Sequence, residues 1–275
     1  MGTPTILSLT IGLAVLAIAF GLVERLRPAL PDQHRSRRDT GVDVAYWFFT
    51  PLVTKAVTRV AVGVAFALLA WWQGLSLADL RDALTSRRTW VSGWPLAVQV
   101  PVILLSADLL AYWSHRVFHG RLLWPFHAVH HSSTTVDWLS SVRLHPVNDA
   151  VTRVVQVLPL YWMGFDGRAL AAFVPLLTLY ALWLHANVGW SYGPFRYVLA
   201  SPVFHRWHHT SETEGLDKNF AGLFPFIDLA FGTFYMPRGR QPRRFGVAGD
   251  PVPDSLVAQL VHPFRALGRG SRGPA

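Results

Sequence analysis

An apolar run near the beginning of this chain constrains its fold more than any other feature. Residues 5–23, TILSLTIGLAVLAIAFGLV, contain nineteen positions without a charged side chain. At about 1.5 Å per helical residue, this run nearly covers a ~30 Å hydrocarbon core. Charged residues make up only 15% of the chain, against about 25% in soluble domains. The sequence therefore predicts an integral membrane protein whose first transmembrane helix is this run.

Two further apolar stretches predict more transmembrane helices. Residues 46–72 are interrupted by Lys55 and Arg59, which share one helical face because they are four positions apart. We expect this face to contact protein or the membrane interface. Residues 95–113 carry one charge, Asp108, and lead directly into the first histidine-rich segment. The helix over this stretch should therefore end where the histidines begin, near a membrane surface.

Two shorter apolar segments predict a helical hairpin. Residues 151–163 and 169–184 are separated by Gly-Phe-Asp-Gly-Arg. Each segment is short for a complete span, so we expect two short, tilted or re-entrant helices. The predicted fold class is all-α integral membrane, with about four transmembrane helices or hairpins and a cytosolic helical cap.

The basic residues predict the orientation in the membrane. No Lys or Arg precedes the first apolar run, and five Arg follow it by position 38, so the positive-inside rule places the N-terminus outside. Three spans and a hairpin then put residues 114–149 and 185–275 on the cytoplasmic side. All the histidines and the basic C-terminus would lie there or at the membrane boundary.

Charge and cysteine content exclude several kinds of site. The formal net charge is +9, but most basic residues flank apolar stretches, which is typical of membrane proteins that contact anionic lipid. No nucleic-acid-binding module accompanies this charge, so we expect no nucleic-acid partner. The chain has no cysteine, which excludes disulfides, thiolate metal sites and iron–sulfur clusters. Any metal must be bound through nitrogen or oxygen.

Histidines are concentrated in one part of the sequence. FHAVHHSS (126–133) and FHRWHHTSE (204–212) share the pattern F-H-x-x-H-H. Positions i, i+3 and i+4 lie on one helical face, so each segment can direct two or three imidazoles at one point. We interpret His34 and His262 as ordinary surface or hydrogen-bonded residues. The other ten of the twelve histidines are His115, His119, His127, His130, His131, His145, His185, His205, His208 and His209.

This clustering predicts a metal site with two ions. Imidazoles packed this closely would repel one another when protonated and cost desolvation free energy when neutral, and imidazole is a good ligand for Zn, Cu, Fe or Ni. A ferritin-like carboxylate site needs several glutamates, and this chain has only Glu24, Glu212 and Glu214. The H-E-x-x-H zinc motif is also absent. A histidine-rich dinuclear centre at a membrane surface remains.

Residues 95–236 resemble the fatty acid hydroxylase and sterol desaturase superfamily of integral-membrane di-iron oxygenases. The order, spacing and apolar framing of the motifs agree with that superfamily. The resemblance implies N-terminal transmembrane helices and a loop (1–92), a fatty acid hydroxylase-like catalytic domain (93–236) and a basic C-terminal tail (237–275). The matching stretches are SHRVFH (114–119), FHAVHHSS, RLHP (143–146), LHANVGW (184–190), FHRWHHTSE and DKNFAGLFPFIDLAFGTFY (217–235).

The resemblance also implies the metal and its ligands. Two iron ions (a di-iron centre) would be held by His115, His119, His127, His130, His131, His185, His205, His208 and His209. Some members carry a second histidine four positions before the equivalent of His185, where this chain has Ala181. His145 is a candidate to supply that ligand instead.

Several polar residues are candidates for a supporting role. Asp108 lies two helical turns before His115, and we expect it to orient that imidazole, or to be a hydrogen-bonding residue at the membrane boundary. Trp138 and Trp207 are interpreted as packing or interface residues. Four residues match family positions and could support ligands, cap helices or fix turns: Asn187, Asp217, Asn219 and Asp228.

The resulting hypothesis is an O2-dependent oxidation of a membrane lipid or sterol-like substrate at a C–H bond. Nothing in the chain resembles a fused cytochrome b5, flavin or nicotinamide domain, so an external electron donor is implied, such as a reductase, a ferredoxin or a cytochrome b5-like protein. Hydroxylation and desaturation both stay open. The alternatives are a membrane transporter or sensor of Zn or Ni, although transporters place ligands near the bilayer midplane, and a haem-binding electron carrier.

Overall fold

The computed structural model describes residues 4–33, 40–76, 78–80, 89–165, 174–247 and 251–269. Within these ranges the chain forms α-helices, short 3-10 helices and one π-helical turn, and it forms no β-strand. In the described part of the chain, extended backbone pairs at two isolated bridges, Pro28 with Val188 and Thr210 with Phe245. The predicted all-α fold class is confirmed.

Three helical segments are long and apolar enough to cross a membrane. They are α1 (Ile6–Leu26), the continuous segment Thr40–Trp72 and α5 (Leu96–Phe118). A capping box fixes the start of α1, because Thr5 and Ser8 exchange hydrogen bonds between side chain and backbone. The predicted integral membrane fold agrees with these helices, whereas the described residues contain three candidate spans rather than about four.

The second candidate span is one continuous helix with a local π turn. Helix α2 (Thr40–Phe49) passes through η1 (Thr50–Thr54) into α3 (Lys55–Trp72). Pro51 lies in the first turn of η1. Proline has no N–H group to continue the hydrogen-bond pattern of the preceding helix, and a one-turn π bulge accommodates this loss without ending the helix.

The two helices of the predicted hairpin pack against different elements. Helix α7 (Pro146–Trp162) begins earlier than predicted, because His145 accepts the backbone N–H of Val147 as its N-cap. It packs against α3 and α5, whereas α9 (Val174–His185) packs against η3 (Trp138–Val142) and α10 (Pro202–His208). Residues 166–173, which include the start of the predicted second arm, lie outside the described residues.

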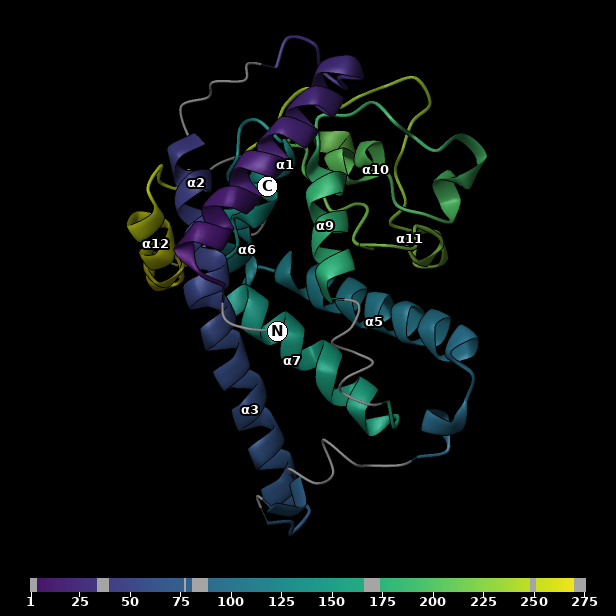
Figure 1. Ribbon diagram of the computed structural model, residues 1–275. Helices are drawn as coiled ribbons and strands as arrows, with labels where there is room; N and C mark the ends of the chain where they lie inside the picture. Colours follow the sequence, from purple (N-terminus) through teal and green to yellow (C-terminus); the bar gives the residue numbers. More distant parts are fainter. Residues whose placement is uncertain are drawn as a thin grey trace.

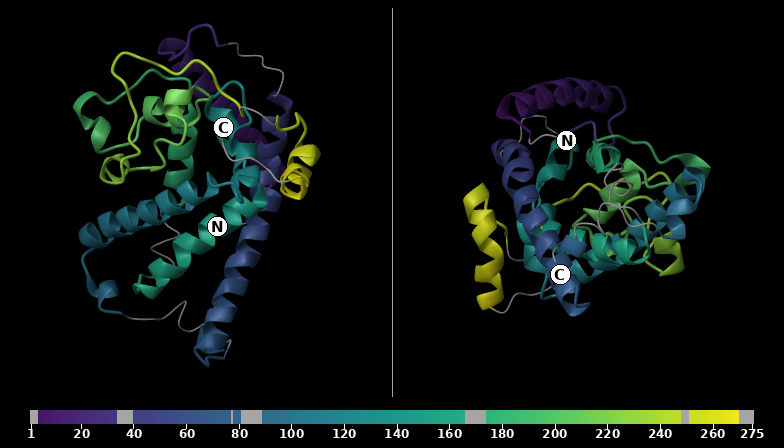
Figure 2. Two further views of the ribbon diagram at one scale, coloured as in Figure 1. Left: turned by 180° about the vertical axis from the view of Figure 1, so that it is seen from behind. Right: turned by 60° about the horizontal axis from the view of Figure 1, so that its bottom comes forward.

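Shorter helices form a cap where α5 and α9 end. Figure 1 shows α3, α7 and α5 fanning out beneath this cap, and Figure 2 shows the same arrangement from behind. Helix α12 (Leu256–Gly268) lies in the predicted C-terminal tail and packs against the side of the cap and α2. The remaining short elements are η2 (Val91–Gly93), α6 (Trp124–His131), η4 (Gly193–Tyr197), η5 (Thr213–Gly215) and α11 (Phe226–Ala230).

Aromatic side chains join the membrane helices to the cap. Phe20 of α1 stacks on Trp138 of η3 with ring centroids 5.3 Å apart, and Trp47 of α2 donates its indole N–H to the Leu9 carbonyl of α1 at 2.8 Å. Trp207 of α10 is fully buried in a second apolar cluster of the cap. The cap is therefore built on the ends of α1 and α2 as well as on α5.

Asp149 provides a polar contact between α7 and α3, with Lys55 Nζ at 2.8 Å and Thr58 Oγ1 at 2.5 Å. We expect Asp149→Ala to lower the free energy of unfolding by about 1–3 kcal/mol, because the ammonium and hydroxyl groups lose their acceptor in a largely buried contact. Thr58→Val keeps the side-chain shape and should cost about 1 kcal/mol. Thermal unfolding in detergent measures both, and an unchanged Asp149→Ala protein would contradict this role.

Candidate metal centre

Nine of the ten clustered histidines converge into two adjoining groups. Within each group, every imidazole places one ring nitrogen within 4.8 Å of the others. The first group contains His115, His119, His127, His131 and His208, and the second contains His130, His185, His205 and His209. Five and four nitrogen donors suit two transition-metal ions. These residues could therefore hold a dinuclear centre.

The two H-x-x-H-H segments divide their histidines between the groups in opposite ways. On α6, His127 and His131 face the first group while His130 faces the second, because side chains four positions apart share a helical face. On α10 and its C-cap, His205 and His209 face the second group, and His208 faces the first. His131 and His209 stack with ring centroids 4.4 Å apart. Two neighbouring short helices thus contribute to both groups.

The ring orientations in the first group suit a bound cation. Nδ1 of His115 lies 2.8 Å from the Phe220 carbonyl, and Nδ1 of His127 lies 2.7 Å from the side-chain oxygen of Asn148. These nitrogens face acceptors, so they carry the ring protons. The two Nε2 atoms then carry lone pairs, and they lie 2.9 Å apart. Lone pairs at this distance repel unless a cation binds both.

The second group repeats this arrangement. Nδ1 of His130 lies 2.9 Å from the Arg143 carbonyl, and Nδ1 of His185 lies 2.8 Å from the Ala181 carbonyl. Their Nε2 atoms are 3.3 Å apart. Ala181, where some family members carry a histidine, thus supplies a backbone acceptor here. Both groups present unprotonated nitrogens inward, as metal ligands do.

Burial keeps the imidazoles neutral. It lowers the pKa of the two outer histidines of α10, His205 and His209, well below the usual range, and neighbouring imidazoles lower it further because like charges repel. The same causes lower the pKa of His127, His131 and His208. Neutral imidazole is the form that binds metal. Metal binding at neutral pH therefore does not first require these rings to lose a proton.

A single loop contacts three imidazoles of the first group. Asp217 Oδ1 lies 2.9 Å from Nδ1 of His119, and the Lys218 carbonyl lies 2.8 Å from Nδ1 of His208. The Phe220 carbonyl, described above, is the third acceptor. The Nε2 atoms of His119 and His208 are buried and have no hydrogen-bond partner among the described residues. Each ring is thus held on its outer side and presents a free nitrogen to the group.

Two buried carboxylates hold this loop. Asp108 accepts the backbone N–H groups of residues 222–224 at 2.8–3.1 Å, and Asp228 accepts those of residues 220–221 at 2.8 and 2.9 Å. The expected direct contact between Asp108 and His115 is not made, because seven positions correspond to about 10 Å of helical rise. Asp108 instead fixes the loop whose carbonyl orients His115.

Two other candidate supporting residues contact backbone rather than imidazoles. Asn219, at a left-handed φ of 60°, donates to the carbonyls of Phe204 and Tyr235 at 2.9 and 2.7 Å. Asn187 bonds the backbone N–H and carbonyl of Leu30 at 3.0 and 3.1 Å. Their contacts are those of residues that fix turns and tie segments together.

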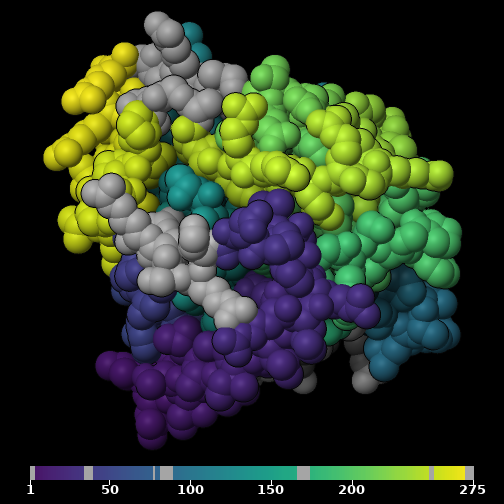
Figure 3. All heavy atoms as spheres, turned by 90° about the horizontal axis from the view of Figure 1, so that it is seen from above, coloured from purple at the N-terminus to yellow at the C-terminus, as the bar shows by residue number. Residues whose placement is uncertain are grey.

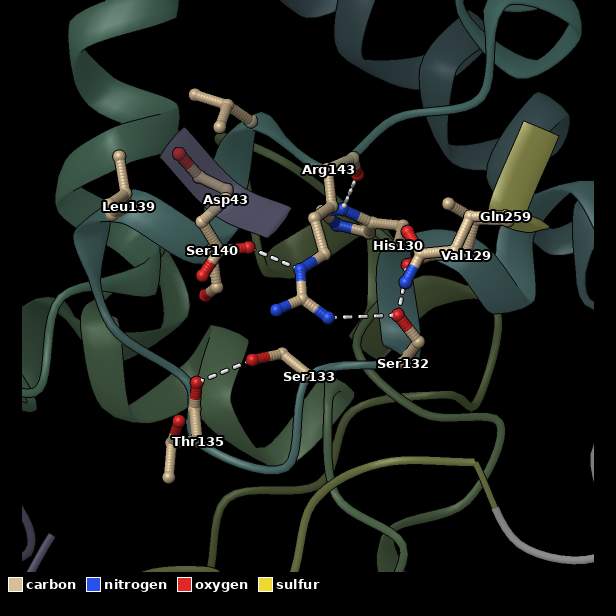
Figure 4. Close-up of polar contacts among 12 residues, drawn as sticks. Asp43, Val129, His130, Ser132, Ser133, Thr135, Leu139, Ser140, Arg143 and Gln259 are labelled. Atoms are coloured by element: carbon tan, nitrogen blue, oxygen red, sulfur yellow. Dashed lines mark hydrogen bonds and ion pairs between the residues drawn. The ribbon is translucent and has the colours of Figure 1, made fainter. Parts of the chain in front are cut away.

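The orientation of His130 depends on a buried ion pair. The Arg143 guanidinium donates to the carboxylate of Asp43 on α2 and, at 3.1 Å, to the hydroxyl of Ser132 (Figure 4). Arg143 is 1% exposed. This pair anchors the backbone whose carbonyl accepts the His130 N–H, so the second candidate span takes part in positioning the second histidine group.

His145 joins neither group. Its Nδ1 accepts the backbone N–H of Val147, and its Nε2 lies 3.1 Å from the Leu260 carbonyl of α12. Both ring nitrogens are thus used in capping α7 and in packing α12. Of the two histidines interpreted as ordinary, His34 lies outside the described residues and His262 lies on α12.

Several groups that contact the imidazoles had not been predicted. Asn148, the acceptor for His127, lies on the first turn of α7, and a polar residue there is a weak signal because helix starts are often polar. The other acceptors are backbone carbonyls of residues 143, 181, 218 and 220. Every residue carries a carbonyl group, so the sequence contains no signal that marks these four.

Residues 100–233 match the family model for fatty acid hydroxylase. The chain contains a fatty acid hydroxylase domain. The ornithine lipid hydroxylase of Rhizobium tropici is 29% identical to the chain over 263 residues, which cover 90% of the chain and 73% of that protein. Human alkylglycerol monooxygenase is 31% identical over 140 residues, which cover 47% of the chain and 29% of that enzyme.

A Delta(7)-sterol 5(6)-desaturase of Gibberella zeae is 28% identical over 149 residues, which cover 52% of the chain and 40% of that enzyme. No solved structure matches the chain. The fatty acid hydroxylase domain and these relatives confirm the predicted resemblance to the superfamily, and the chain is an oxidoreductase. The match spans under half the length of the monooxygenase and the desaturase. It therefore does not assign the activity or substrate of either complete enzyme to this chain.

Asp108→Asn is expected to lower the metal content of the purified protein by about one ion per chain. The amide would present N–H groups to the backbone N–H groups of the loop that holds the first histidine group, and one unsatisfied buried pair costs about 1–3 kcal/mol. Elemental analysis measures this loss. Asp254→Asn, at an exposed position, is the matched control and should change nothing. Full metal content in Asp108→Asn would contradict the proposed support.

Proposed function

We propose that this fatty acid hydroxylase-domain protein binds two iron ions and uses O2 to oxidise a C–H bond of a membrane lipid. The observation that carries this proposal is the pair of adjoining histidine groups, in each of which two ring nitrogens without protons face one another, at 2.9 Å in the first group and 3.3 Å in the second. Such an arrangement is stable only with a cation in each group. Imidazole nitrogens suit Zn, Cu, Fe or Ni, and the resemblance to di-iron oxygenases favours iron among them.

The chain's own residues would position the metals and keep the site dry. Carbonyl, amide and carboxylate oxygens on the outer side of six of the nine rings fix those imidazoles, which holds much of the ligand set in place before metal binds. Seven of the nine histidines are buried, and His115 and His130 are half-buried, so bulk water has little access to the reacting atoms. Iron bound there would supply O2 activation and C–H oxidation.

Hydroxylation of a polar membrane lipid is the favoured reaction within this class. The relative that aligns over 90% of the chain is named as an ornithine lipid hydroxylase, and the vertebrate relatives are named as alkylglycerol monooxygenases. A desaturase is also among the relatives, but it aligns over 52% of the chain. We therefore rank a lipid with a polar head group above a sterol.

The orientation and the electron source form part of the same proposal. With the N-terminus outside, the histidine groups would lie at the cytoplasmic surface, where soluble electron carriers are available. An external donor such as a ferredoxin, a reductase or a cytochrome b5-like protein would supply the two electrons that a monooxygenase needs. Transport of Zn or Ni has no support from relatives such as the ornithine lipid hydroxylase, the alkylglycerol monooxygenases, a very-long-chain aldehyde decarbonylase and the sterol desaturase.

We expect about two irons per chain, and the two groups should lose metal separately. His208→Ala removes a donor from the first group and His130→Ala removes one from the second, so each variant should retain about one ion. His145→Ala should retain both ions, because that ring is used in helix capping, and should lower stability by about 1 kcal/mol. Elemental analysis and Mössbauer spectroscopy measure these contents. Stoichiometric zinc in protein purified from iron-replete cells would refute the di-iron proposal.

The reduced, iron-loaded protein in lipid vesicles should incorporate one atom of isotopically labelled O2 into a polar lipid. His208→Ala and His130→Ala should each lower product formation by at least about a hundredfold, because each breaks one half of the ligand set. Mass spectrometry of extracted lipid measures the incorporation. A lipid that loses two hydrogens without gaining oxygen would identify a desaturase instead.

A further inference from the structure

A second candidate binding site lies outside the histidine groups, at the edge of the cap. It is a cavity of about 550 Å³ between η4 and the segment that follows Met236. Figure 3 shows this segment crossing the upper face of the molecule and lying against the green residues around η4. Arg196, Arg238 and Arg240 line the cavity. None of the described residues that line it is an aspartate or a glutamate, so the cavity has a positive potential.

The Arg196 side chain is fixed by its neighbours, but one of its buried N–H groups lacks a hydrogen-bond acceptor among the described residues. One N–H group of its guanidinium donates to the Met236 carbonyl, and the group lies over the rings of Tyr197 and Phe234 at 5.1 and 5.6 Å. Its Nε atom is buried and has no hydrogen-bond partner among the described residues. Buried donors without a partner are rare. A planar guanidinium with free N–H groups matches the oxygens of a phosphate.

Arg238 and Arg240 differ in how much of their positive charge is free to attract a ligand. Arg240 forms an ion pair with Glu214 at 2.6 Å, so its charge is largely neutralised. Arg238 is exposed at the mouth of the cavity. Arg196 and Arg238 therefore supply most of the positive charge that a ligand would meet.

Exposed apolar residues lie close in sequence to residues that line this positive cavity. Phe195 and Val198 beside Arg196 are 67% and 53% exposed, and Trp190 and Leu199 are also exposed. In water, four exposed apolar side chains within ten residues of sequence would be unfavourable. Aromatic residues next to arginines are typical of the membrane–water interface, where the rings lie at the level of the lipid head groups. The helix that leads into this region, α9, is itself apolar.

We propose that this cavity binds the head group of an anionic phospholipid, with its phosphate at Arg196 and Arg238 and its acyl chains against Phe195, Val198 and Leu199. A soluble phosphate would use the arginines but leave the exposed apolar residues in water, so the combination favours a lipid. Val203 of α10 lines the inner wall, two positions before His205. A bound lipid would thus fasten the outer side of a helix that supplies three metal ligands. This inference does not depend on the proposed oxidation.

The test uses the full-length protein, delipidated in a neutral detergent, with short-chain phosphatidylglycerol as the probe. Native mass spectrometry should detect phosphatidylglycerol bound with at least tenfold higher affinity than phosphatidylcholine of the same chain length. Arg238→Gln should weaken that binding by about three- to tenfold, and Arg196→Gln combined with it by more than tenfold. Arg265→Gln, an exposed arginine of α12, is the control and should bind as the unmodified protein does.

Three outcomes would overturn the assignment. Equal binding of phosphatidylcholine would show that the site does not select for charge. Competition by inorganic phosphate at millimolar concentration would identify a soluble anion as the ligand. Unchanged phosphatidylglycerol affinity in Arg238→Gln would place the lipid elsewhere, and this variant carries the test if Arg196→Gln fails to fold, because the Arg238 side chain is exposed.

Discussion

The constraint on which this structure depends is the repulsion between nine closely packed imidazole rings. A ring whose proton lies on the outer nitrogen turns a lone pair inward, and a bound cation would remove the repulsion between such lone pairs. In six of the nine rings the outer nitrogen faces an oxygen of another residue. For His115 this is a carbonyl from residue 220, and for His130 it is one from residue 143.

The candidate membrane spans therefore do more than anchor the domain. Helix α5 carries both His115 and Asp108, and Asp108 fixes the loop that contacts three imidazoles. Helix α2 carries Asp43, which pairs with Arg143 and so holds the backbone acceptor of His130. Because the same helices cross the bilayer and position the ligands, we expect the metal site to be sensitive to changes in helix packing that are far from any histidine.

A lipid-oxidising site at a membrane surface also has to keep its position relative to the bilayer. The exposed apolar residues around η4 and the arginine-lined cavity, if it binds lipid as proposed, would provide a means of doing so. The histidine groups and this cavity share α10 as a common wall. The proposed chemistry and the proposed lipid site thus use opposite faces of one short helix.

The sequence by itself determined the all-α membrane class and ten candidate histidines, because uncharged runs and i, i+3, i+4 spacing depend only on local geometry. It did not determine how the H-x-x-H-H segments divide between two groups, since that follows from the packing of α6 beside α10. It suggested His145 as a ligand and a direct contact from Asp108 to His115, and tertiary structure placed both residues elsewhere. Only the folded chain could decide which backbone carbonyls orient the rings, because carbonyl groups are common to all residues and acquire a role only through position.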